Sequence, residues 1–301
     1  TLWDLDAFIF RRGDLIEFDL WAGTIMIILL LEATRRAVGW AMVIILAFFL
    51  VQTSFSDYFF SIFYGPPSSW FSIIDYLFMR ENGIYSIPLM VMATSIFLFI
   101  LFGDILVRSG AGRFFINVAL ALTGSKVGGP AKASVVASCL MASVSGSAVA
   151  NVVTTGSFTI PLMKRIGYRD YFAGAVEACA SSGGQIMPPV MGAAAFIIAE
   201  FLNIPYMKVA VAGLIPALIY FFSIFVMVHF EARKRNLPTI TPEELPVFKD
   251  EVLRGGHLFL SIVVIVVLMI IGYTPMFAAF WAIISILVLS SLRKETRMSP
   301  V

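Results

Sequence analysis

The sequence predicts an all-α polytopic membrane protein, and three observations lead to this fold class. The chain of 301 residues is 59% hydrophobic and has a mean hydropathy of +0.92, whereas soluble domains are usually about half apolar. Long apolar runs alternate with short polar segments, as in successive membrane-spanning helices. Basic residues cluster between these runs, which is typical of topology signals.

Composition also excludes several classes of function. The formal net charge of +2 gives no support to nucleic-acid binding. The only histidines are His229 and His257, without a His-Glu-x-x-His motif or a Cys/His cluster, so a zinc site has no support. Cys139 and Cys179 lie in apolar stretches, which favours two buried small residues over a disulfide. We therefore expect no cofactor and no enzymatic activity.

The first third of the chain predicts two apolar segments, a loop and a spanning helix. Leu20 to Leu31 is short for a span, and Val38 to Val51 can span; Arg35-Arg36 between them is interpreted as a topology anchor. Residues 52–85 contain few basic residues and several aromatic ones, which predicts an external loop with interfacial side chains such as Trp70 and Tyr76. Ile87 to Val107 is a clear spanning helix.

A short apolar piece, Phe114 to Leu122, cannot span the bilayer. Basic residues flank it on both sides, so the positive-inside rule places both of its ends in the cytoplasm. We expect it to lie along the interface as an amphipathic arm. The flanking basic residues are Arg108, Arg113, Lys126 and Lys132.

The central stretch from Ala133 to Met163 contains no Asp, Glu, Lys or Arg, but it carries six serines, three threonines and Asn151. A straight helix of this length would be about 46 Å long, against roughly 30 Å for the hydrocarbon core. Basic residues lie at both ends, at Lys132 and at Lys164-Arg165. The stretch therefore predicts a re-entrant helical hairpin with a polar tip near Ser145 to Asn151, a structure tolerated where it lines a cavity.

Tyr168 to Asn203 predicts a discontinuous helix. Its middle reads Gly183-Gly-Gln-Ile-Met-Pro-Pro189, and paired glycines followed by paired prolines should unwind a helix. Val209 to Val228 spans back, residues 231–256 form a charged cytoplasmic loop, and a final helical hairpin turns at Gly272 to Pro275. This hairpin pairs Leu258 to Ile271 with Met276 to Leu292.

The hairpin tip and the helix break together form the candidate site. Hydroxyls, an amide and freed carbonyls suit a small hard cation such as sodium, whereas the plainer alternative is that small residues only allow close packing. The candidate sodium ligands are Ser145, Asn151 and Gly183. The candidate substrate- or ion-binding residues are Ser143, Ser145, Gly146, Ser147, Asn151, Thr154, Thr155, Gly183, Gly184, Gln185, Ile186, Met187, Pro188 and Pro189.

Glu177 is the acid inside the discontinuous helix, and two interpretations of it stay open. It is a candidate coupling acid, since ionisable groups inside membranes are usually functional, or a structural partner of a nearby arginine or backbone donor. Asp104 and Glu200 lie near the expected membrane faces and favour interfacial positions. His229 and His257 lie at cytoplasmic helix ends, where a solvated or capping role is favoured.

Several of these motifs resemble the membrane component of tripartite ATP-independent periplasmic (TRAP) transporters. The arrangement is most similar to the TAXI type, in which small and large membrane subunits are fused, and the resemblance is dense from Gly124 to Tyr206. It is carried by Ser143-Val-Ser-Gly-Ser-Ala-Val-Ala-Asn-Val-Val-Thr-Thr-Gly156, Ile160-Pro-Leu-Met163, Gly167-Tyr168, Gly174-Ala-Val-Glu-Ala178 and Gly183-Gly-Gln-Ile-Met-Pro-Pro189.

The resemblance implies a permease subunit in the inner membrane. A TAXI-type extracytoplasmic binding protein would deliver an organic acid, which an elevator motion coupled to sodium, or to protons, would import. It also implies five parts of the chain. These are 1–55 as the end of a small-subunit-like scaffold, 56–85 as an extracytoplasmic loop, 86–132 as a scaffold helix and interfacial arm, 133–205 as the transport-domain hairpin and broken helix, and 206–301 as scaffold helices with the cytoplasmic loop 231–256.

One departure from the family pattern affects this expectation. The family's large subunit has two inverted repeats, and the sequence after Arg254 shows neither a second Ser-Gly-Ser hairpin nor a second Gly-Gly…Pro-Pro break. The chain also begins at Thr1. We therefore expect a piece of a longer protein that holds one repeat and does not transport alone. The rival interpretations are an ion channel, a scaffold subunit and an intramembrane serine hydrolase, and the last lacks an intramembrane base.

The asymmetry of basic residues predicts that 52–85 is extracytoplasmic and that 233–256 is cytoplasmic. Single cysteines introduced as Ser68→Cys and Asn236→Cys should react with a membrane-impermeant thiol reagent from opposite sides of the membrane. Labelling of both cysteines from one side would contradict the predicted topology.

Overall fold

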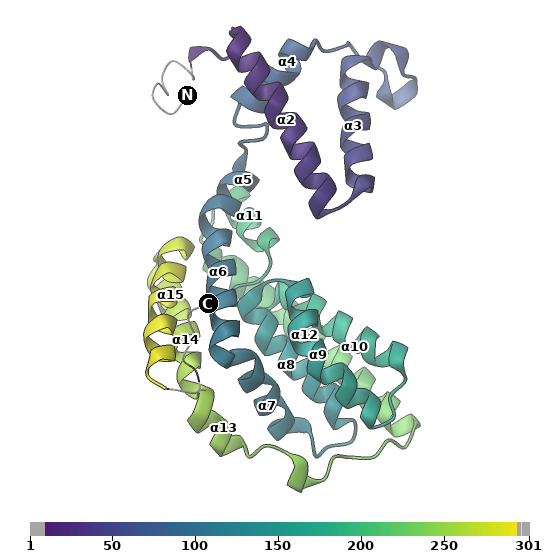
Figure 1. Cartoon of the computed structure of the whole chain (residues 1–301), viewed down its shortest axis with the longest axis vertical. Helices are drawn as coiled ribbons and strands as arrows, with labels where there is room; N and C mark the ends of the chain where they lie inside the picture. Colours follow the sequence, from purple (N-terminus) through teal and green to yellow (C-terminus); the bar gives the residue numbers. More distant parts are fainter. Residues whose placement is uncertain (1–9, 294–295, 297–301) are drawn as a thin grey trace. The chain divides into compact units, whose positions relative to one another are not determined.

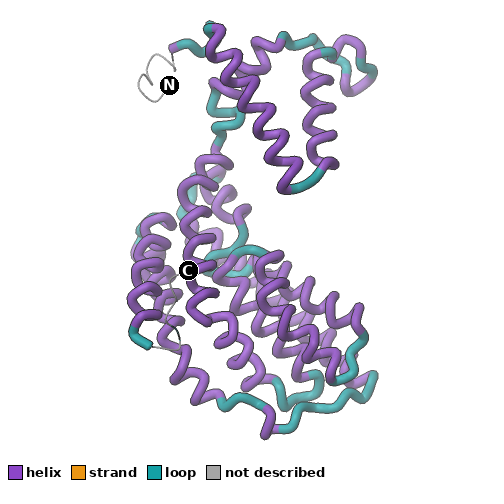
Figure 2. Tube along the Cα trace, viewed as in Figure 1, coloured by secondary structure: helices purple, strands orange, loops and turns teal. Residues whose placement is uncertain are grey.

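The computed structural model describes residues 10–293 and residue 296. Within these residues the regular structure is helical and no strand occurs, which confirms the predicted all-α fold class (Figure 2). The chain divides into two compact units, Thr1–Met90 and Val91–Val301, and each is described here by itself.

The first unit is built on two apolar helices, α2 (Glu17–Ala37) and α3 (Trp40–Ser54), which correspond to the two predicted apolar segments. Gly39 joins them with a φ of 102°, a conformation that favours glycine. No residue of α3 is buried, and most of its large apolar side chains are exposed, as they would be toward lipid.

The predicted external loop, residues 52–85, contains more structure than expected. Its second half forms a helix that packs on α2, with Ile74 and Phe78 against Ile27 and the Trp70 indole N–H donating to Thr24 Oγ1 at 3.0 Å. Apolar residues at three- and four-residue spacing produce this helix, a pattern obscured in the sequence by the aromatic and proline residues before it. The elements are η1 (Ser56–Tyr58), η2 (Ser61–Phe63), α4 (Trp70–Ile74) and the π-helical η3 (Asp75–Met79).

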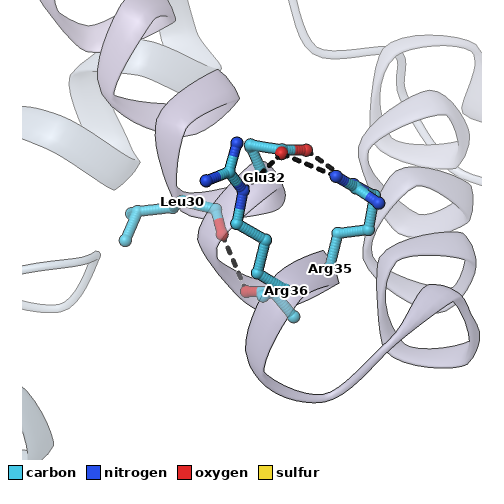
Figure 3. A network of polar contacts seen from close by, with 5 residues as sticks. Leu30, Glu32, Arg35 and Arg36 are labelled. Atoms are coloured by element: carbon cyan, nitrogen blue, oxygen red, sulfur yellow. Dashed lines mark hydrogen bonds and ion pairs between the residues drawn. The ribbon is translucent and has the colours of Figure 1, made fainter.

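The basic pair after the apolar part of α2 shares one carboxylate (Figure 3). Arg35 donates to Glu32 through two nitrogens at 2.7 and 2.8 Å, and Arg36 donates through Nε at 2.8 Å. Hydrogen bonds from Arg35 and then Arg36 lower the pKa of Glu32 to about 2. The Arg35 guanidinium also lies 5.4 Å from the centre of the Trp40 ring, so this cluster connects the facing ends of α2 and α3.

A helix of 37 residues, Ile87–Thr123, leads into the second unit and changes direction within itself (Figure 1). Gly110 has a φ of 96°, which separates the apolar first part from a final segment. This bend agrees with the predicted separation of a spanning helix from a short arm; the position of the arm at the membrane interface stays a prediction. The segments are α5 (Ile87–Val91), η4 (Met92–Ile96), α6 (Phe97–Leu106), η5 (Val107–Ala111) and α7 (Gly112–Thr123).

The predicted hairpin is confirmed as two antiparallel helices, α8 (Gly129–Ser145) and α9 (Ala148–Arg165). The chain reverses at Gly146 and Ser147, where Gly146 takes a left-handed φ of 61°. The predicted discontinuous helix is confirmed as well. It consists of α10 (Asp170–Gly183), the 3₁₀ turn η6 (Gly184–Ile186), a non-helical segment and α11 (Ala193–Phe201).

The remaining helices complete the second unit (Figure 1). The predicted C-terminal pair is confirmed, but the segment predicted as a charged cytoplasmic loop contains an additional amphipathic helix, α13, whose Gly255 lies against the Phe114 ring of α7. Among the described residues, Ile87–Thr123, Tyr206–Lys234 and Phe248–Ile271 are long and apolar enough to cross a membrane. The elements are α12 (Tyr206–Lys234), η7 (Pro242–Glu244), α13 (Phe248–Gly255), η8 (Gly256–Leu258), α14 (Phe259–Ile271) and α15 (Pro275–Ser291).

Candidate ion and substrate site

The hairpin tip and the helix break meet in the structure, as the candidate site requires. The Val190 backbone N–H donates to the Ser143 carbonyl at 3.1 Å. Gly146 approaches the break so closely that a Cβ there would overlap the Met191 carbonyl oxygen. A Cβ on Gly184 would likewise overlap the Ala142 side chain of α8. The two elements therefore touch through backbone, and glycine is needed at both close approaches.

The break is held in a defined shape by a few hydrogen bonds. Pro188 and Pro189 have no N–H, so they cannot donate to the carbonyls that end α10. The Gly192 N–H instead donates to the Gln185 carbonyl at 2.7 Å and closes the segment on itself. Of the predicted site residues here, Gly183 and Gly184 are buried, and Gln185 and Ile186 are exposed.

The serines of the tip mainly satisfy the ends of the two hairpin helices. Ser147 caps α9 by accepting from the Ala150 N–H at 3.3 Å, and Ser145 Oγ accepts from the Ser147 N–H at 3.5 Å. Ser143 Oγ donates to the Leu140 carbonyl at 2.8 Å. Ser145, Gly146 and Ser147 are each half-buried at the point where the chain reverses.

Asn151 and Thr155 lie inside the hairpin, between α8 and α9, and both are fully buried. Asn151 Nδ2 donates to the Ser138 carbonyl at 3.2 Å, across the hairpin. Thr154 donates to the Ala150 carbonyl of its own helix at 2.8 Å. The structure thus places Ser143 and Gly146 directly beside the break, with Ser145 next to them in the chain, whereas Asn151 and Thr155 lie deeper between the two helices.

Glu177 is fully buried and accepts hydrogen bonds from five hydroxyl groups on three helices. Hydroxyls saturate both of its oxygens, which offsets the cost of removing a carboxylate from water. Neither the arginine nor the backbone donor considered from the sequence is the partner. The donors are Ser134 at 2.6 Å, Ser138 at 2.9 Å, Thr159 at 2.5 Å, Ser181 at 3.3 Å, and Thr155.

The sequence contained a signal for this cluster that its first interpretation missed. Each helix contributes two of the polar residues at a spacing of four: 134 and 138, 155 and 159, 177 and 181. Residues four apart lie on one face of a helix, so three such pairs can converge. The cluster extends away from the tip, since Ser134 precedes Ser145 by eleven residues, about 16 Å along a helix, and its near end is joined to Asn151 by the Thr155 hydroxyl, which donates to the Asn151 carbonyl at 2.8 Å.

The histidines and cysteines lie outside this site. His229 is half-buried, and its Nδ1 lies 3.0 Å from the Nζ of the buried Lys132; the solvated or capping role expected for His229 stays a prediction. His257 Nε2 lies 3.3 Å from Thr296 Oγ1. Cys139 and Cys179 are free thiols, but Cys139 is half-buried and Cys179 is exposed, so the expectation of two buried residues is wrong. Within the described residues, no group of three or more His, Cys, Asp and Glu side chains could hold a metal ion.

Comparisons with known proteins show which family the sequence matches. Residues 25–301 match the family described as "Tripartite ATP-independent periplasmic transporter, DctM component". The chain is 33% identical over 140 residues to the C4-dicarboxylate TRAP transporter large permease protein of Vibrio cholerae, covering 46% of this chain and 30% of that protein. It is 29% identical over 142 residues to the sialic acid TRAP transporter large permease protein of the same species, covering 47% and 33%.

A longer match is with the uncharacterized protein YgiK of Salmonella typhimurium, at 27% identity over 203 residues, which covers 67% of this chain and 46% of YgiK. The chain therefore spans less than half of the length of each of these three relatives.

The contact between tip and break predicts the effect of adding one methyl group. Gly146→Ala must relieve both a left-handed φ and an overlap with Met191, so we expect it to lower the free energy of unfolding by about 3 kcal/mol. Gly272→Ala is the matched control, because Gly272 has a φ of 103° but no atom within 4 Å of an added Cβ. Thermal unfolding in detergent compares the two, and equal losses would show that tip and break do not press together.

Proposed function

The chain belongs to the DctM-component family of tripartite ATP-independent periplasmic transporters, and from this premise we propose that it acts in the large permease component of a secondary active importer of organic acids. The relatives support this substrate class, since C4-dicarboxylates and sialic acid, named for two of them, are both carboxylic acids. Family membership and the long apolar helices make the chain a multi-pass protein of the inner membrane.

The observation that carries the proposal is the contact between the hairpin tip and the unwound break. Regular helical hydrogen bonding ends at both elements, so some carbonyl groups near Ser145 and around the break can turn toward a ligand, although those of Gly184 and Gln185 accept from Met187 and Gly192. Such neutral oxygens replace the hydration shell of a small hard cation. We place the coupling sodium ion here, with Ser145, Asn151 and Gly183 as its candidate ligands and the organic acid bound beside it.

An elevator mechanism requires the site to move as one rigid body. The hydroxyl cluster around Glu177 supports this requirement, because it joins α8, α9 and α10 by hydrogen bonds in their buried interior. We therefore propose residues 133–205 as the moving part and the flanking helices as the scaffold. An extracytoplasmic binding protein of the TAXI type would supply the substrate, and residues 1–55 would correspond to a fused small subunit.

Two other functions are the rivals of this proposal. An ion channel would conduct without saturation and without a binding protein, and a scaffold subunit would show no sodium response. Uptake by the full-length permease in proteoliposomes, with and without the binding protein and a sodium gradient, distinguishes the three. Saturable uptake that needs both the binding protein and the sodium gradient supports the proposed importer.

The sodium site predicts separable effects on ion affinity and stability. In the full-length permease, Ser145→Ala should raise the sodium concentration for half-maximal uptake about fivefold, the effect of losing one ligand, with little change in melting temperature. Asn151→Ala should do the same with a modest loss of stability, because it also removes the bond to Ser138. Ser157→Ala, an exposed serine on α9, is the control. A sharp fall in melting temperature with unchanged sodium dependence would identify both residues as packing devices.

Glu177 supports a second coupling mode, in which a proton accompanies the substrate. Thr155 and Thr159 each have an alternative acceptor, the Asn151 carbonyl at 2.8 Å and the Thr155 carbonyl at 3.0 Å. Their hydroxyls can therefore donate to an ionised Glu177 carboxylate. Alternatively, each can donate to a carbonyl of its own helix and accept a hydrogen bond from a protonated Glu177 carboxyl group. This adaptability is the observation that favours a proton-binding role beside the structural one.

Replacing the acid by its amide tests both roles of Glu177. We expect Glu177→Gln to lower the free energy of unfolding by about 2 kcal/mol, since an amide N–H₂ meets hydroxyl donors where the carboxylate accepted. Below its melting temperature, the variant should keep sodium-driven uptake and lose uptake driven by a proton gradient. Glu200→Gln, an exposed acid on α11, is the control. If Glu177→Gln has the melting temperature of the wild type and the same uptake in a proton gradient, Glu177 has neither the structural role nor the proton-binding role.

A further inference from the structure

The break lacks backbone donors at its centre, and a tyrosine of another helix supplies one. Tyr206, the first residue of α12, directs its hydroxyl at two consecutive carbonyl groups, those of Pro189 at 3.0 Å and of Val190. A helix would satisfy such carbonyls from N–H groups further along the chain, but the prolines have interrupted the helix here. The phenolic O–H replaces the missing backbone donor.

The Tyr206 side chain is itself held firmly. It is 5% exposed, and its ring stacks on Phe196 of α11 with centroids 4.2 Å apart and planes inclined by 13°. Phe196 in turn contacts Phe99 of α6, with ring centroids 5.1 Å apart. A buried, stacked ring has little rotational freedom, so the direction of its hydroxyl is fixed by packing.

Val190 transmits this constraint to the hairpin. Its carbonyl accepts from Tyr206, while its N–H donates to the Ser143 carbonyl of α8 at 3.1 Å. The residue therefore bridges α12 and the hairpin tip through its two backbone groups. Two turns further along α12, Gly213 provides space for the Met191 side chain, because a Cβ there would lie 2.7 Å from Met191 Cε. One face of α12 thus holds two successive residues of the break.

We infer that Tyr206 is a positioning residue for the ion site, fixing the Pro189 and Val190 carbonyls toward α12 and thereby setting how the break presents its other carbonyls to the hairpin tip. The inference rests on the proposed sodium site for its functional consequence. The positioning itself depends only on the hydrogen bonds and packing of Tyr206, so it can be tested without sodium.

The test compares Tyr206→Phe with the wild-type full-length permease in detergent. Phenylalanine keeps the stacked ring and removes only the hydroxyl. Without sodium, backbone hydrogen exchange of the peptide covering 187–196 should become about fivefold faster, because one hydrogen bond that restrains the break is lost. The sodium concentration for half-maximal thermal stabilisation should rise about fivefold, while the sodium-free melting temperature changes by only a few degrees.

Tyr168→Phe is the matched control, since Tyr168 is also a buried tyrosine (3% exposed) whose hydroxyl donates to a backbone carbonyl, that of Val228, at 3.5 Å. It should leave the exchange of 187–196 and the sodium response unchanged. If Tyr206→Phe is not recovered folded, Phe196→Leu removes the ring on which Tyr206 stacks and should accelerate exchange of the same peptide.

The outcomes distinguish a failure of the positioning role of Tyr206 from a failure of the proposed sodium site. Unchanged exchange of 187–196 in the Tyr206 variant overturns the positioning role, whatever the sodium response. Faster exchange with a wild-type sodium response also overturns it, because the break would then move without affecting the ion. A wild-type protein that does not respond to sodium refutes the proposed sodium site, and the exchange result still decides whether Tyr206 holds the break.

Discussion

The buried carboxylate of Glu177 is the interaction on which the arrangement of α8, α9 and α10 depends. A charged or neutral carboxyl group in an apolar interior must have all of its hydrogen-bonding capacity used, and here five hydroxyls provide for it. Because these hydroxyls come from all three helices, their relative rotation and depth are fixed together. The contact between tip and break depends on the same alignment, because Ser181 of the cluster lies three residues before Gly184 of the break.

The backbone around the tip and the break follows a second constraint, that polar main-chain groups inside a membrane protein need partners. The two elements solve it by different means. At the tip, Ser147 caps the helix that begins there, and Gly146 turns the chain in a left-handed conformation. At the break, the prolines remove donors, and the remaining carbonyls depend on contacts from other elements, including Tyr206 and the hairpin itself. The break therefore has its shape only in the folded protein.

Local signals in the sequence were enough to predict the hairpin and the discontinuous helix. A long uncharged run with ten polar residues, and paired glycines before paired prolines, each constrain a short piece of chain strongly. The missed features depend on partners distant in sequence. The helix at Trp70 needs α2 to pack on, α13 packs against Phe114, and His229 contacts Lys132, which lies 97 residues earlier on α8. In the candidate site, Ser145 and Gly146 could be proposed from the tip sequence alone, and the four-residue spacing indicates which hydroxyls can converge on Glu177, whereas the contact of Tyr206 with the break required the fold.

The close approaches at Gly146 and Gly184 bring main chain into the contact, because the Gly146 backbone meets the Met191 carbonyl oxygen and the Gly184 backbone meets the Ala142 methyl group. An amino-acid replacement alters a side chain and leaves its carbonyl oxygen in place. A library of single substitutions would therefore measure how much space surrounds the backbone in this region. It would report little about the backbone carbonyl oxygens, because no single substitution removes them. Two chains could therefore differ in the side chains around these glycines and still present the same oxygens, because the backbone conformation positions them.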